Sequence, residues 1–137
     1  MFEIEMEEKM LKYLETRQDV LLLGKEVPFL SRCIDIVFLN IDNQLITFEL
    51  KIKDWRRAIK QALNHKLGAD YSYICIPKRK LTPGLQSNIE SAKIGLVMFD
   101  NEAEIPIEVV LPAPYNNNQL IFKQILIDNL SKCKIYS

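Results

Sequence analysis

The sequence has few of the residues that mark disulfide-rich, metal-stapled or membrane proteins. Its 137 residues include three cysteines and one histidine, with no Cys-x-x-Cys pair, so neither a disulfide framework nor a zinc site is indicated. No apolar run approaches the ~18 residues that span a bilayer. The N-terminus is acidic, whereas a signal peptide begins with a basic region. We therefore expect a cytoplasmic protein that makes no membrane association.

The sequence also has few glycines and no net charge. There are four glycines and no GxxxxGK[ST] or GxGxxG motif, so we expect no nucleotide cofactor. Eighteen basic side chains balance eighteen acidic ones, which argues against a general polyanion binder. What is present is a 48% hydrophobic, 26% charged chain, the composition of one globular domain over residues 1–137.

Hydrophobic periodicity divides the chain into helices and strands. Helical spacing and helix-end signals predict helices over residues 2–16, 55–67, 82–92 and 119–131. Alternating or extended patterns predict strands over residues 20–29, 32–39, 45–53, 71–76, 94–99 and 105–111. Asp54 is the expected N-cap of the second helix and Gly68 its stop. This order combines an antiparallel hairpin with a helical crossover, which indicates an α/β or α+β fold around one mixed sheet.

The residues that carry chemistry lie on two neighbouring predicted strands. Ile36 and Phe48 should both face the core, and the register that pairs them also pairs Asp35 with Glu49. Lys51 follows two residues after Glu49 and shares its face. Hydrophobic patterning therefore places two carboxylates side by side with a lysine next to them.

This register constrains the loop between the two strands. A two-residue loop at Asp42-Asn43 would turn Asp35 to the opposite face, so we expect an odd-length loop or a bulge. Paired carboxylates suit a hard divalent cation such as Mg²⁺, which activates water and polarises phosphate. The alternative is a solvated strand face with a cross-strand acid there by chance.

Asp35, then Glu49-Leu50-Lys51, then a helix carrying Gln61 resembles the PD-(D/E)xK nuclease superfamily. The likeness extends over residues 5–77. The segment ITFELKIKDWRRAIKQALNHKLGADYSYICIP is similar to small members related to archaeal Holliday-junction resolvases and RecB-type nuclease domains. The resemblance implies a restriction-endonuclease-like α/β fold, with an αβββαβ core in a central mixed sheet flanked by helices.

The resemblance also implies roles for individual residues. Asp35, Glu49 and the Leu50 carbonyl would bind Mg²⁺, with Mn²⁺ able to replace it, and Lys51 would be the catalytic lysine. Gln61 matches the helix glutamine of the RecB-like motif, whereas the only histidine of the chain, four residues later, stands where many relatives have a tyrosine.

Such families often carry a further glutamate in their first helix. Apolar residues three, four and seven positions after Glu7 make it the best candidate, ahead of the other acids Glu3, Glu5 and Glu8. The alternative is that Glu7 is an ordinary solvated helix acid.

Basic residues are concentrated directly after the lysine motif. Residues 51–80 contain nine basic and two acidic side chains. Trp55 is expected to anchor its helix to the sheet, with base stacking as the alternative. We expect four residues of this segment to contact a phosphate backbone: Lys53, Arg56, Arg57 and Lys60. The alternative is that they form the solvated face of an amphipathic helix.

Together these features predict a Mg²⁺-dependent endonuclease or exonuclease that acts on DNA. The alternative is a catalytically inactive nucleic-acid-binding or interaction module with the nuclease fold. The last predicted helix, over residues 119–131, is more apolar than one core contact requires, so we also expect a homodimer.

Overall fold

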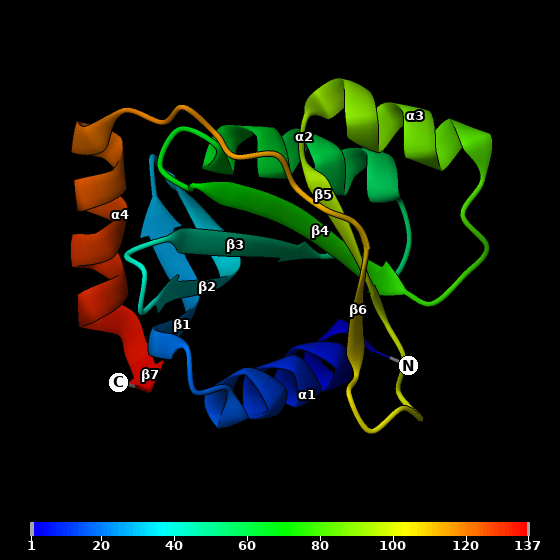
Figure 1. Cartoon of the computed structure of the whole chain (residues 1–137), viewed down its shortest axis with the longest axis horizontal. Coiled ribbons are helices and arrows are strands. Elements are labelled where there is room, and N and C mark those ends of the chain that lie inside the picture. The colour runs from blue at the N-terminus through cyan, green and yellow to red at the C-terminus, as the bar shows by residue number, and fades with distance from the viewer. Residues whose placement is uncertain (1, 137) are drawn as a thin grey trace.

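Seven strands form one mixed sheet in the computed structural model, which describes residues 2–136 (Figure 1). The strands are β1 (Val20–Phe29), β2 (Arg32–Asn40), β3 (Leu45–Leu50), β4 (Tyr71–Pro77), β5 (Gly95–Phe99), β6 (Ile107–Leu111) and β7 (Lys134–Tyr136). The helices are α1 (Glu3–Thr16), α2 (Trp55–His65), α3 (Pro83–Ala92) and α4 (Leu120–Cys133). The strand order is β6-β5-β4-β3-β2-β1-β7, with parallel pairs β3–β4 and β4–β5 and the other pairs antiparallel. The predicted order of elements is confirmed up to α4, and β7 is an addition.

Helices cover both faces of the sheet (Figure 1). The apolar stripe of α1 buries Met6, Met10 and Leu14 against one face, where Phe38 and Phe48 contribute to the same core. The recurrence of these residues at helical spacing explains why this segment is helical, since its other positions are largely charged. Burial of this stripe holds α1, and the acids on its surface, close to β2 and β3.

The opposite face is covered by α2 and α3, which share one core with β4 and β5. In α2 the small residues Ala58 and Ala62 are fully buried, which lets the helix backbone approach the sheet closely. Helix α4 lies across β1 and buries Leu126 and Leu130 there (Figure 1). Among the described residues, no helix is both long and apolar enough to cross a membrane.

The predicted register between β2 and β3 is confirmed. Ile36 pairs with Phe48, and the pairing continues to Leu39 and Leu45. The N–H of Asn40 donates to the carbonyl of Gln44 at 3.0 Å, which closes a loop over residues 41–43. Asn43 in this loop has a φ of 58°, the left-handed conformation that ends a three-residue hairpin loop. The odd-length loop is therefore the one that the hydrophobic pattern requires.

Three details at the ends of β3 and α2 differ from the prediction. Strand β3 ends at Leu50, so Lys51 lies just beyond the strand, although its N–H still donates to the carbonyl of Cys75 at 3.0 Å. Asp54 is the N-cap of α2, but its backbone is left-handed at φ 59° and its side chain makes no capping hydrogen bond. Helix α2 ends at His65, two residues earlier than predicted, and residues 66–68 form a turn that includes Gly68.

Candidate active site

Two carboxylates lie together where β3 ends. The Oδ2 atom of Asp35, on β2, accepts a 2.8 Å hydrogen bond from the N–H of Leu50. Glu49 is only 5% exposed, and its carboxyl group shares a hydrogen bond with that of Asp35. The two side chains are thus on the same face of the hairpin, as the register of the strands predicts. Their roles as metal ligands stay predictions.

Burial and mutual repulsion control the ionisation of this pair. The pKa of Glu49 is raised to about 9, first by burial, then by the charge of Asp35 and the hydrogen bond between the two groups. Burial also raises the pKa of Asp35, while the Leu50 N–H and Glu49 lower it by hydrogen bonding. With a pKa of about 9, Glu49 is protonated near neutral pH. A bound cation would displace that proton, because metal binding favours the ionised ligands.

Lys51 and Glu3 lie beside the pair. The Nζ atom of Lys51 is 3.9 Å from Oε1 of Glu3, and the same oxygen accepts a 3.3 Å hydrogen bond from the N–H of Ile52. The positive charge of Lys51 lowers the pKa values of both buried carboxyl groups, and the charge of Glu3 raises them. The candidate site thus has an acidic side chain, Glu3, and a basic one, Lys51, on the side that faces solvent.

Helix α1 brings Glu7 to the pair as well. Glu7 is half-buried, in contrast to the exposed Glu3, Glu5 and Glu8. Its pKa is raised by burial first and then by the charge of Asp35. The charge of Asp35 thus acts on Glu7, whose role in the site stays a prediction. Sequence reasoning ranked Glu3 below Glu7, although the four-residue spacing of the two places them on one helix face.

Helix α2 places His65 beside Glu49. The Nε2 atom of His65 is 3.6 Å from Oε2 of Glu49, and His65 is 2% exposed. Burial lowers the pKa of His65 to about 4, so the imidazole is neutral at physiological pH and forms no ion pair there. Gln61 lies one turn earlier on α2. Within the described structure, Oε2 of Glu49, Oε1 of Gln61 and Nδ1 of His65 are buried without a hydrogen-bond partner.

The donor set at the end of β3 fits Mg²⁺. Among residues 2–136, no group of three or more His, Cys, Asp or Glu side chains is placed to hold a metal ion. Mg²⁺ does not require such a group, since it binds through one or two carboxylates and keeps several waters. Asp35, the unpartnered Oε2 of Glu49 and the Leu50 carbonyl would supply three oxygens of the kind it prefers.

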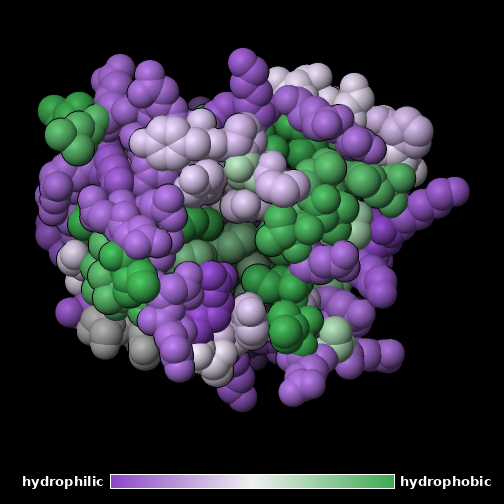
Figure 2. Space-filling model, viewed as in Figure 1, coloured by the Kyte–Doolittle hydropathy of each residue, from purple (hydrophilic) through white to green (hydrophobic). Residues whose placement is uncertain are grey.

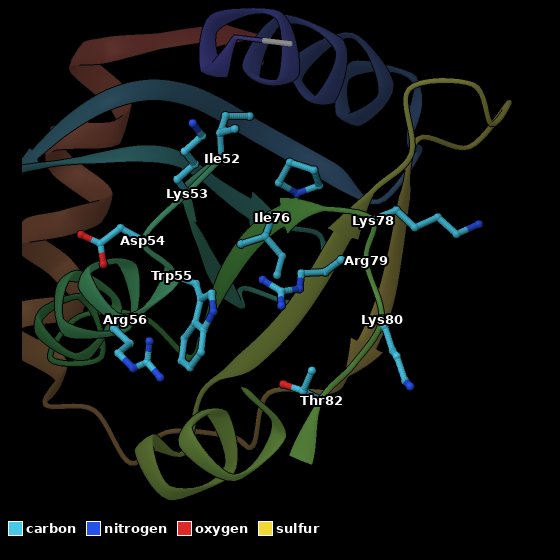
Figure 3. A pocket seen from close by; sticks show the side chains of 11 residues that line it. Ile52, Lys53, Asp54, Trp55, Arg56, Ile76, Lys78, Arg79, Lys80 and Thr82 are labelled. Carbon is cyan, nitrogen blue, oxygen red and sulfur yellow. The ribbon is translucent and has the colours of Figure 1, made fainter. Parts of the chain in front are cut away.

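The predicted nucleic-acid contacts divide into two groups. Lys53 and Arg56 line a cavity of about 610 Å³ beside the site (Figure 3). Arg57 and Lys60 are exposed on α2 and do not line it. The structure adds basic residues 78–80 to the cavity wall, because the parallel pairing of β3 and β4 brings the segments that follow them together.

No protein-family model matches the sequence, and no curated protein matches it. Two solved structures share its fold. One is the SPO1766 protein of unknown function from Silicibacter pomeroyi, with a TM-score of 0.59 and 17% identity over 80% of this chain and 71% of that one. The other is a repair endonuclease from Pyrococcus abyssi, with a TM-score of 0.54 and 19% identity over 73% of this chain. The matched region covers 47% of the repair endonuclease, so this chain spans about half its length.

At such low identities the two likenesses show the fold. The predicted fold class is confirmed: the chain has an α/β, restriction-endonuclease-like fold with a central mixed sheet flanked by helices.

Proposed function

We propose that this protein is a Mg²⁺-dependent nuclease that hydrolyses phosphodiester bonds of DNA, as an endonuclease or an exonuclease. The observation that carries the proposal is the pair of Asp35 and Glu49 at the end of β3, where Oε2 of the buried Glu49 has no hydrogen-bond partner and is free to bind a cation. The likeness to a repair endonuclease supports the same class of activity.

Each residue of the site has a distinct part in this proposal. Asp35, Glu49 and the Leu50 carbonyl would hold Mg²⁺, which when bound polarises a phosphate and lowers the pKa of a coordinated water. The Leu50 N–H keeps Asp35 in place at 2.8 Å. Lys51 is placed to neutralise charge that develops on the phosphate or to orient the attacking water. Glu7 and Glu3 would hold further waters on the side of α1.

The proposal is tested by cleavage of labelled DNA. The substrates are a single strand, a blunt duplex, a flap and a four-way junction, each with Mg²⁺, with Mn²⁺ and with EDTA. We expect metal-dependent cleavage of at least one substrate by the wild-type protein, and none by Glu49→Gln. Glu108→Gln is the matched control, because Glu108 is an exposed strand glutamate on β6 and should leave cleavage unchanged. The proposal fails if the wild-type protein cuts nothing, or if Glu49→Gln cuts equally well.

A second candidate is a nucleic-acid-binding module that keeps the nuclease fold without catalysis. It is favoured by the small number of metal-ligating side chains, since two carboxylates form no larger cluster among residues 2–136. DNA binding by the wild-type protein without cleavage in either metal would select this candidate.

A further inference from the structure

The cavity beside the candidate active site is formed by two segments that are distant in the sequence. It lies at the C-terminal ends of the parallel strands β3 and β4 (Figure 3). One wall is residues 52–56, which lead from β3 into α2, and the other is residues 76–82, which lead from β4 towards α3. A neighbouring hollow that contains Glu3 and Lys51 shares residues 52–54 with it. The cavity therefore adjoins the end of β3 at which the candidate active site lies.

The lining of the cavity is strongly basic. The residues that line it include five basic ones and a single acid, Asp54. Lys78 forms an ion pair with Asp100 at 3.5 Å, and in Figure 3 it points away from the hollow. Within the described residues, no ion pair involves the remaining four, which are Lys53, Arg56, Arg79 and Lys80. Unpaired positive charge around a concave surface favours a phosphate-bearing ligand.

Trp55 gives the same cavity an aromatic surface. Its indole is half-buried and packs against the core between α2, α3 and the sheet. The guanidinium of Arg56 lies 4.4 Å from the centroid of the indole ring. Figure 3 shows the indole of Trp55 and the guanidinium of Arg79 reaching into the hollow from its two walls. An aromatic ring beside unpaired cations is the combination that holds single-stranded nucleic acids.

We propose that this cavity binds one unpaired nucleotide of the DNA strand that lies at Asp35 and Glu49. The base stacks on Trp55, and the phosphates contact Arg79 and Lys80. A volume of about 610 Å³ is in the range of pockets that hold one small molecule, so it admits a single nucleotide but no base-paired duplex. The inference rests on the proposed nuclease function and deepens it, because it makes the substrate a strand with unpaired nucleotides.

The single tryptophan of the chain provides a direct test. In EDTA, where no cleavage occurs, the wild-type protein is titrated with a short oligothymidylate and with a blunt duplex while the fluorescence of Trp55 is recorded. We expect the oligothymidylate to quench the fluorescence and to bind about tenfold more tightly than the duplex, because stacking of one base contributes on that order. Equal affinity for the two, or binding without quenching, would overturn the proposal.

Substitutions in the wall identify the contacts. Arg79→Ala and Lys80→Ala should each weaken oligothymidylate binding several-fold and make it less sensitive to salt, because each removes a phosphate contact. Lys132→Ala is the matched control, since Lys132 is an exposed lysine on α4, away from the cavity. If the Arg79 and Lys80 variants bind as Lys132→Ala does, the cavity is not the binding site.

Trp55 itself is tested by anisotropy of a labelled oligothymidylate. Trp55→Phe keeps a stacking ring and should bind nearly as well as the wild type. Trp55→Leu keeps a smaller apolar side chain against the core but removes the stacking ring, and should bind about tenfold more weakly. Circular dichroism checks that both Trp55 variants are folded. If one of them is not, the surface variants Arg79→Ala and Lys80→Ala decide whether the cavity binds the oligothymidylate.

These binding measurements are independent of catalysis. Single-strand binding at Trp55 without metal-dependent cleavage would keep the cavity as a binding site and overturn the nuclease. Metal-dependent cleavage of a blunt duplex by a protein that shows no preference for single strands would keep the nuclease and overturn the cavity as a nucleotide-binding site.

Discussion

The two ends of β3 each hold a buried acid, and the two acids have opposite surroundings. At the beginning of the strand, Asp70 is 1% exposed and accepts hydrogen bonds from the Leu45 N–H at 2.7 Å and from Asn118 at 3.1 Å. Lys123 of α4 pairs with it at 2.8 Å. At the end of the strand, Oε2 of Glu49 is buried without a partner, next to a second carboxyl group.

The difference separates a structural acid from a candidate functional one. The charge of Asp70 is balanced within the fold, and its partners tie α4 and the segment before it to β3. Glu49 has a buried oxygen that is free to bind a ligand. This arrangement lowers the stability of the fold, because burial and the charge of Asp35 both oppose the ionisation of Glu49. Sites built for a ligand are often destabilising until the ligand binds.

Matched amide substitutions at the two acids should have opposite effects on stability. Asp70→Asn removes a buried charge and leaves Lys123 without its acidic partner, so we expect a loss of about 3 kcal/mol in the free energy of unfolding. Glu49→Gln removes the group whose ionisation the fold opposes, and should gain about 1 kcal/mol in EDTA. Urea unfolding of the wild type and both variants measures these changes. Destabilisation by Glu49→Gln in EDTA would show that Glu49 has a structural role like that of Asp70.

Lys51 lies at the Glu49 end of β3, and its substitution tests whether that end is catalytic. Lys51→Ala should lower the cleavage rate by about 10²–10³-fold, because it removes a charge directed at the transition state. Metal binding should persist, since an ammonium group is no metal ligand. Lys51→Arg should not restore the rate, because a guanidinium is broader and differently hydrated. Single-turnover cleavage and a metal titration followed by thermal stability separate the two effects, and loss of metal binding would contradict the assignment.

The smallest effect that we expect concerns self-association, at the end of β3 where Asp70 lies. Helix α4 begins there with Leu120 and Ile121, which are 77% and 67% exposed. Figure 2 shows apolar surface at the upper left, where α4 begins in the same view. We expect a homodimer that uses this surface, and Ile121→Glu should convert it to a monomer without changing the stability of the fold. Light scattering at micromolar concentration provides the measurement, and a monomeric wild-type protein would remove the prediction.

Most of the local structure follows from short-range patterns. The two-residue spacing of Ile34, Ile36 and Phe38 identifies β2, and the alternation of apolar with polar residues identifies β3. Element boundaries were less accurate: β3 is three residues shorter than predicted, and Asp54 does not cap α2 with its side chain. Strand β7 was missed because three residues are too few for a periodic pattern, and it forms by pairing with β1.

By itself, the sequence determined the carboxylate pair. A one-residue slip would turn every side chain of a strand to the opposite face of the sheet, so the pattern that sets Ile36 beside Phe48 was enough to set Asp35 beside Glu49. Only the tertiary structure decided what surrounds that pair. Glu3 reaches Lys51 because α1 packs on the sheet, and residues 78–80 join Lys53 because β3 and β4 pair in parallel after a helical crossover. Such contacts depend on how whole elements pack, and no local pattern in the chain encodes that arrangement.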